Sequence, residues 1–226
     1  MKPVITNIFC IMGQPGSGKG IILQNLLNET EFITKYNVYK LIYGTTRPMR
    51  YNDIENVTYH FYTKEEYDNI DKAEIIESRS YDNATTEDIY YFFTLFSHIK
   101  YGSNNIGKVS FFQYEELKKW ALRNELANPM HRINLFPIIV NTSLFEREKR
   151  LVNDSVTEND IYEICARLLS ERYEFEMVLK TSPEIIDSLN PDTCTINNLT
   201  TEERNITLAV EQIKSFIKQK LSIQGI

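Results

Sequence analysis

The sequence lacks several features that mark whole classes of protein. It has no run of about 18 apolar residues, so we expect no membrane-spanning helix. The N-terminal segment lacks a long apolar stretch behind basic residues, so we expect no signal peptide. Cys10, Cys165 and Cys194 have neither CxxC nor metal-ligand spacing, which is typical of a reducing compartment. Internal repeats and low-complexity tracts are absent too. We therefore expect a cytoplasmic protein that does not interact with membranes.

Positive charge is also scarce. The 226 residues include 25 Lys and Arg against 31 Asp and Glu, which gives a formal net charge of −6. This balance argues against a broad nucleic-acid-binding surface, although it allows a local basic pocket. Hydrophobic residues make up 42% of the chain, enough for one packed domain with small inserts.

The most informative stretch is the segment from Gly13 to Lys19, which has the Gly-x-x-x-x-Gly-Lys spacing of a phosphate-binding loop. An apolar run of strand length, residues 8–12, precedes it, and residues 21–27 place their apolar side chains on one helical face. Glycines let backbone N–H groups converge on a phosphate, and the following helix adds its positive end. The alternative, a glycine turn with Lys19 in solvent, does not account for this context.

The residue after Lys19 departs from the usual pattern. It is Gly20, followed by Ile21, where phosphate loops commonly carry a Ser or Thr hydroxyl that contacts Mg²⁺. We therefore expect Mg²⁺ to be held by phosphate oxygens and water, with no ligand from protein side chains.

Two arginines lie three residues apart in a Thr-Thr-Arg-Pro-Met-Arg stretch at 45–50. Pro48 disfavours helix at Arg47, so Arg47 and Arg50 lie on an extended loop from which both guanidinium groups can reach one anion. A solvated basic turn is the alternative interpretation.

Alternating strands and helices predict an α/β fold with a central parallel sheet. Expected strands cover residues 38–43, 57–62, 74–81, 89–96, 108–112, 133–140 and 193–196; expected helices cover 64–70, 113–124, 159–180 and a C-terminal segment with an apolar stripe from Ile206 to Leu221. Residues 43–94 resemble a small, mostly antiparallel sheet inserted between elements of the parallel sheet.

Together these motifs resemble guanylate kinases. The matching residues are the phosphate loop, Thr-Thr-Arg-Pro-Met-Arg at 45–50, Tyr-His-Phe at 59–61, Ile-Ile-Glu at 75–77, Tyr-Phe-Phe-Thr at 91–94, Glu-Ile-Cys-Ala-Arg at 163–167 and Thr-Ile-Asn-Asn at 195–198. The resemblance implies a three-layer P-loop NTPase fold in one domain. Its core would be residues 1–42, 95–140 and 165–226, its GMP-binding insert 43–94 and its helical lid 141–164.

The resemblance also implies a reaction, in which the γ-phosphoryl group of Mg²⁺-bound ATP is transferred to GMP in purine nucleotide metabolism. The implied ATP-binding residues are Gly13, Gln14, Pro15, Gly16, Ser17, Gly18, Lys19, Gly20 and Ile21. The implied GMP-binding residues are Arg47, Arg50, Tyr59, Glu77, Tyr91 and Thr94. The implied catalytic residues are Lys19, Arg147, Arg150 and Arg167. The partners would be ATP and GMP, and the protein a monomer or homodimer.

Each implied role has a plainer alternative. Glu77 could be a strand residue facing solvent, and Tyr59 a core aromatic. Arg147 and Arg150 could belong to a solvated helix face, and Arg167 could pair with a glutamate one helical turn away. Tyr43 and Ala166 replace residues that many guanylate kinases use to hold phosphate.

Two other functions stay open at this point. One is a guanylate-kinase-like module that binds a protein and has lost catalysis, and the other is a kinase with a different phosphorylated acceptor.

Overall fold

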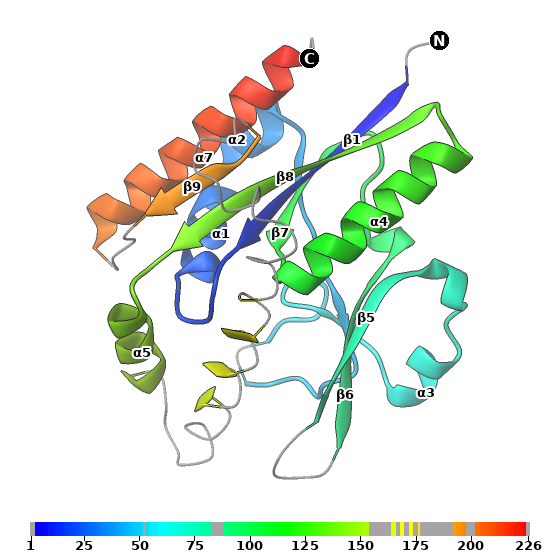
Figure 1. The fold of residues 1–226 in the computed structure, drawn as a ribbon, viewed down its shortest axis with the longest axis horizontal. Helices are drawn as coiled ribbons and strands as arrows, with labels where there is room; N and C mark the ends of the chain where they lie inside the picture. The colour runs from blue at the N-terminus through cyan, green and yellow to red at the C-terminus, as the bar shows by residue number, and fades with distance from the viewer. Residues whose placement is uncertain are drawn as a thin grey trace.

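A computed structural model describes residues 3–51, 53–82, 88–153, 164–165, 168–169, 172–173, 176, 192–197 and 202–224. In this part of the chain the central sheet has five parallel strands, in the order β2 (Val38–Lys40), β7 (Asn104–Lys108), β1 (Val4–Met12), β8 (His131–Asn141) and β9 (Cys194–Asn197). Helices cover both faces of this sheet (Figure 1). The predicted α/β class with a central parallel sheet is confirmed.

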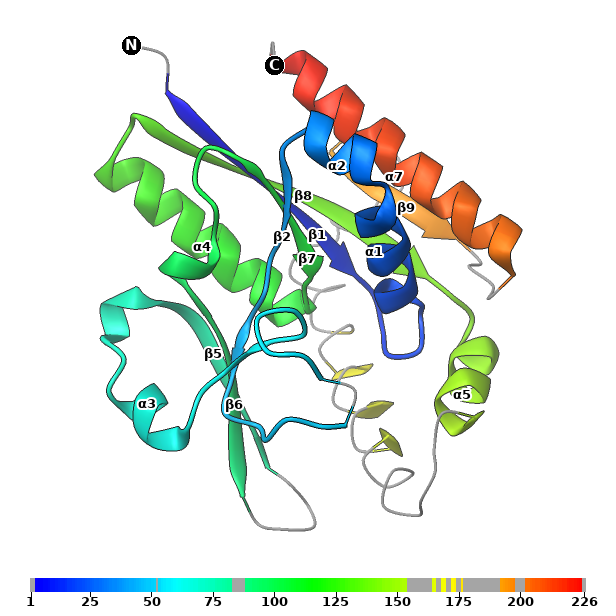
Figure 2. The same cartoon turned by 180° about the vertical axis from the view of Figure 1, so that it is seen from behind.

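The two faces of the sheet carry separate hydrophobic cores. Alternation along β1 places Phe9 and Ile11 on one face and Ile8, Cys10 and Met12 on the other. The first face packs against α1 (Lys19–Asn28), α2 (Thr30–Lys35) and α7 (Glu203–Ile223), and the second against α4 (Phe111–Ala127), as Figures 1 and 2 show. This arrangement is the predicted three-layer sandwich.

Two helices bury an apolar face, and that of the C-terminal helix is the stripe expected from the sequence. Leu117, Trp120 and Ala121 of α4 are buried, and so is the C-terminal stripe from Ile206 to Leu221. Cys10 is fully buried, which raises the pKa of its thiol. Among the described residues no helix is both long and apolar enough to cross a membrane.

The insert forms a second sheet of four strands, in the order β4 (His60–Phe61), β3 (Gly44–Thr45), β6 (Ile89–Leu95) and β5 (Ile75–Asp82). The β3–β6 and β5–β6 pairs are antiparallel and the β3–β4 pair is parallel, so the sheet is mostly antiparallel, as predicted. The short helix α3 (Lys64–Asp68) lies within the helix expected over 64–70 and begins with a capping box at Thr63. Two 3₁₀ turns, Lys72–Glu74 and Phe96–His98, flank the hairpin of β5 and β6.

Three strand predictions were wrong in their extent. The segment 108–112 is not a strand, because β7 ends at Lys108 and Ser110 caps α4, whose first residue is Phe111. The strand expected over 38–43 is interrupted after Lys40, and the chain then enters the second sheet at Gly44. Of residues 57–62, only His60 and Phe61 form a strand.

Of the expected lid, residues 141–164, the structure describes mainly the first part. Helix α5 (Leu144–Asn153) follows β8 and lies beside the loop that ends β1 (Figure 2). The helix expected over 159–180 lies mostly outside the described residues, and the division into core, insert and lid stays a prediction.

Candidate functional site

The phosphate loop (Gly13–Lys19) is a tight turn between β1 and α1, and two of its glycines have no room for a side chain. A Cβ added at Gly13 would lie 2.4 Å from the carbonyl oxygen of Val140, and one at Gly16, whose φ is +71°, would lie 2.7 Å from that of Arg147. Gly20 differs, because a Cβ there would meet nothing within 4 Å. Its lack of a side chain is therefore not a steric requirement of the fold.

Lys19 is folded over the loop. Its Nζ donates to the carbonyl oxygens of Gly13 at 2.5 Å and Gln14 at 2.9 Å. It is also the first residue of α1, whose first turn contains no acidic side chain to offset the positive end of the helix. Cationic charge and a helix amino terminus therefore meet at the same place, which is the chemistry that holds an anion.

The loop also contains a buried hydroxyl. Ser17 is 1% exposed, and its Oγ has no hydrogen-bond partner among the described residues. These residues contain no group of three His, Cys, Asp or Glu side chains that could hold a metal ion. The buried hydroxyl is a donor that suits a phosphate, and the binding of Mg²⁺ through phosphate oxygens and water stays a prediction.

Helix α5 contacts the outer side of the loop. Arg147 is 6% exposed, and its Nη1 donates to the carbonyl oxygen of Pro15 at 3.4 Å. Arg150 donates from Nη1 to the carbonyl oxygen of Gly16 at 3.0 Å. The solvated-face interpretation of Arg147 is therefore wrong, while the catalytic role of both arginines stays a prediction.

Next to the loop lies a cavity of about 220 Å³ at the carboxyl ends of β1, β8 and β9. Gly13, Gln14, Phe111, Arg147 and Asn197 are among its lining residues. Ligands of open α/β sheets bind at this edge. Ile21, which was expected to bind ATP, is 39% exposed. Arg167 lies outside the described residues, so the catalytic role of Arg167 stays a prediction.

The insert contains a buried carboxylate. Glu77 of β5 is 4% exposed, so the alternative of a solvent-facing strand residue is wrong. Its Oε1 accepts from Thr94 Oγ1 at 2.6 Å and from Gln113 Nε2 at 3.0 Å. Its Oε2 is buried and has no hydrogen-bond partner among the described residues. A buried, unsatisfied carboxylate oxygen costs free energy, so this atom is suited to accept from a ligand.

Burial raises the pKa of Glu77, and the hydrogen bonds from Thr94 and Gln113, together with the charge of Arg79, oppose that rise.

Gln113 was not predicted as a site residue. The Oε1 of Gln113 accepts from the backbone N–H of Ser110, and the Ser110 hydroxyl accepts from the backbone N–H of Gln113. These two hydrogen bonds form a capping box at the start of α4. The Ser-x-x-Gln spacing is the sequence signal for this arrangement.

The two faces of the hairpin separate the predicted residues. Glu77 lies opposite Thr94, and alternation places Phe92 on the same face. Tyr91 lies on the other face, where its ring stacks on that of Tyr67 with centroids 4.5 Å apart. The structure therefore brings Thr94 to Glu77 and does not bring Tyr91 there.

The predicted phosphate arginines are held by an aspartate. Arg47 Nη2 lies 2.7 Å from Asp53 Oδ2, and the two side chains are 11% and 9% exposed. The backbone N–H of Arg50 donates to the same oxygen at 2.7 Å. Burial acts to raise the pKa of Asp53, but these two hydrogen bonds and the arginine charges outweigh it and lower the pKa.

The Arg47 guanidinium also lies 5.6 Å from the ring centre of Tyr59, so these two predicted residues are neighbours. Arg47 is thus not a solvated turn residue. Tyr43, which replaces a residue that many guanylate kinases use to hold phosphate, points into the core and is 8% exposed. Its hydroxyl would lie 2.9 Å from a Cβ added at Gly107.

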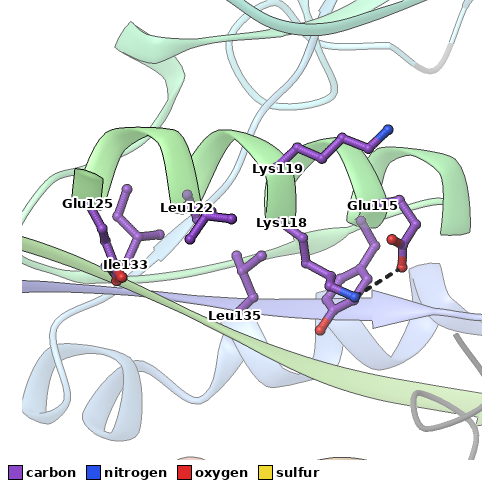
Figure 3. A pocket seen from close by; sticks show the side chains of 9 residues that line it. Glu115, Lys118, Lys119, Leu122, Glu125, Ile133 and Leu135 are labelled. Atoms are coloured by element: carbon purple, nitrogen blue, oxygen red, sulfur yellow. Dashed lines mark hydrogen bonds and ion pairs between the residues drawn. The ribbon is translucent and has the colours of Figure 1, made fainter. Parts of the chain in front are cut away.

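A second, more open groove of about 440 Å³ lies between α4 and β8 (Figure 3). Its lining combines apolar residues, such as Leu122 and Ile133, with a Lys118–Glu115 ion pair at 3.5 Å. Ile133 belongs to the amino-terminal half of β8, away from the carboxyl edge where the phosphate loop lies.

Comparison with known proteins bears on the family and on the fold. Residues 5–93 match the family model of guanylate kinase. The match confirms the predicted resemblance and covers the phosphate loop, Arg47, Arg50, Tyr59 and Glu77. No curated protein sequence matches the chain significantly.

The guanylate kinase fold extends beyond that segment. The crystal structure of guanylate kinase from Anaplasma phagocytophilum superposes with a TM-score of 0.57, over 97% of this chain and 87% of that one. The two sequences are 16% identical, so this likeness concerns the fold.

Proposed function

We propose that this protein is a guanylate kinase that transfers the γ-phosphoryl group of ATP to GMP, giving ADP and GDP. The observation that carries the proposal is the buried Oε2 of Glu77, which has no hydrogen-bond partner in the described part of the chain. The Watson–Crick edge of guanine offers N1–H and the N2 amine as donors, and adenine has no donor at its N1 and C2 positions. A buried carboxylate therefore favours guanine.

The phosphate loop and the insert would each hold the phosphate end of one nucleotide. The phosphate loop and Lys19 would hold the ATP phosphates, and Arg47, Arg50 and Tyr59 would hold the GMP phosphate. Mg²⁺ bound to ATP would neutralise part of the phosphate charge. The acceptor is already an ionised phosphate, so the proposed reaction needs positioned charge and no general base.

The placement of the residues refines the proposed list. Thr94 supports Glu77 directly, and Gln113 joins it as a second supporting donor. Tyr91 is left out because it lies on the opposite face of the hairpin. The cytoplasmic location and the monomeric or homodimeric state stay predictions from the sequence.

A coupled assay of ADP release against a panel of phosphorylated acceptors tests the proposal. The proposal predicts release with GMP and a rate with AMP lower by about 10³-fold or more, because a mismatched base leaves Glu77 unpaired. Release with another acceptor alone supports a kinase of different specificity. No release with any acceptor supports a binding module without catalysis.

A further inference from the structure

Three side chains outside the phosphate loop hold its outer carbonyl groups. Thr142, in the turn between β8 and α5, is 6% exposed, and its Oγ1 donates to the carbonyl oxygen of Ser17 at 3.0 Å. Arg147 and Arg150 donate to the carbonyl oxygens of Pro15 and Gly16.

Lys19 Nζ donates hydrogen bonds to the carbonyl oxygens of Gly13 and Gln14. Each carbonyl from Gly13 to Ser17 therefore accepts a hydrogen bond from a side chain, and the last three bonds reach across 125 to 134 residues of sequence.

These bonds orient the peptide groups of the loop. In a planar trans peptide, the C=O of one residue and the N–H of the next point in opposite directions. Because the carbonyls of Pro15, Gly16 and Ser17 point at their side-chain donors, the N–H groups of Gly16, Ser17 and Gly18 point away from them. The Ser17 N–H donates to the Gln14 carbonyl oxygen at 3.2 Å, so the orientation leaves the N–H groups of Gly16 and Gly18 for a phosphate held inside the loop.

We propose that Thr142, Arg147 and Arg150 form an outer clamp that positions the phosphate loop for the nucleotide polyphosphate. The proposal rests on the proposed function only in taking ATP and ADP as the ligands of the loop. The backbone packing agrees with it, since the carbonyl oxygen of Arg147 lies so close to Gly16 that a Cβ there would approach it to 2.7 Å.

Thr142 separates this role from a direct contact with phosphate. Its hydroxyl is committed to the Ser17 carbonyl, and the side chain carries no charge. Its loss therefore acts on the nucleotide only through the loop. A direct phosphate ligand acting on the transferred γ-phosphoryl group lowers kcat without changing ADP affinity, whereas loss of the clamp weakens ADP and ATP together and spares GMP.

The test is ADP binding in the absence of acceptor, measured by isothermal titration calorimetry. Thr142→Val keeps the shape of the side chain and removes the donor, and we expect ADP affinity to fall about fivefold. Thr142→Ser keeps the donor, and we expect affinity close to that of the unmodified protein. The KM for GMP should not change in either variant.

Unchanged ADP affinity in Thr142→Val overturns the clamp, and so does an equal loss of ADP and GMP affinity, which indicates general damage to the fold. If Thr142→Val does not fold, Arg150→Met replaces it, with the same expected loss of ADP affinity. An unmodified protein that binds ADP but transfers nothing to GMP contradicts the proposed function, whereas the ADP measurements still decide the clamp.

Discussion

Replacing Glu77 by Gln changes one buried atom at the centre of the proposed acceptor site. The variant keeps an oxygen that can accept from Thr94 and Gln113, as Oε1 does now. It places an NH₂ group where the unpaired Oε2 lies. That group is a donor, so it would face the N1–H and N2 donors of guanine.

The expected loss follows from the hydrogen bonds that disappear. A hydrogen bond to a charged group contributes about 1.5–3 kcal/mol, and the variant loses up to two such bonds to the base. We therefore expect kcat/KM for GMP to fall by at least about 10²-fold, because about 1.4 kcal/mol corresponds to a tenfold change. The KM for ATP should stay the same, since Glu77 lies in the insert and not in the phosphate loop.

Stability should move in the opposite direction. Burial raises the pKa of Glu77, so at neutral pH the folded state holds a carboxylate charge that the unfolded state solvates better. This penalty is present above the raised pKa and disappears as the pH falls below the pKa of the unfolded chain. Glu77→Gln should therefore raise the melting temperature at neutral pH while it impairs GMP use.

Steady-state kinetics with each nucleotide varied in turn, combined with thermal unfolding, measure both effects. Thr94→Ser, which retains the hydroxyl donor to Glu77, is the matched control. Equal losses for ATP and GMP would refute the base-recognition role of Glu77, and so would unchanged kinetics with GMP.

Three further variants test the other parts of the site. Lys19→Ala should lower kcat by at least about 10²-fold in the coupled assay, because a cation at the transferred phosphate is lost; turnover close to that of the unmodified protein would exclude the loop as the donor site. Arg47→Lys should raise the KM for GMP about tenfold with little change for ATP, since a lysine lacks the two-pronged geometry that fits phosphate; the opposite pattern would place Arg47 at the donor. Gln113→Met removes a hydrogen bond that lowers the pKa of Glu77, so the rise in GMP KM on acidification should begin at a higher pH, and an unshifted pH profile would contradict this role.

Local patterns accounted for much of the fold. The apolar run at residues 8–12 predicted part of β1, glycine spacing predicted the phosphate loop, and apolar periodicity at 21–27 predicted α1. The capping box at Thr63 marks the start of α3. The error at 108–112 has a physical origin. Phe111 and Phe112 favour a strand by propensity, but the Ser110–Gln113 capping box and the packing of α4 on the sheet outweigh that preference.

The site was less predictable than the fold, because its residues meet through tertiary structure. Motifs pointed to Glu77 and Arg47, but no local pattern shows that Gln113 reaches Glu77 from 36 residues away or that Thr142 reaches Ser17 from 125 residues away. Tyr91 shows the converse limit. It belongs to a matching motif, yet strand alternation turns it to the opposite face.

The most direct test of the account is to separate the products formed by the purified protein from Mg²⁺-ATP and GMP. Chromatography of the nucleotides should show ADP and GDP in equal amounts, with neither formed at a comparable rate when AMP replaces GMP. ADP without GDP would indicate hydrolysis, and the absence of both would indicate a binding protein. Either result would contradict the proposal that Glu77 and the phosphate loop act together in a guanylate kinase.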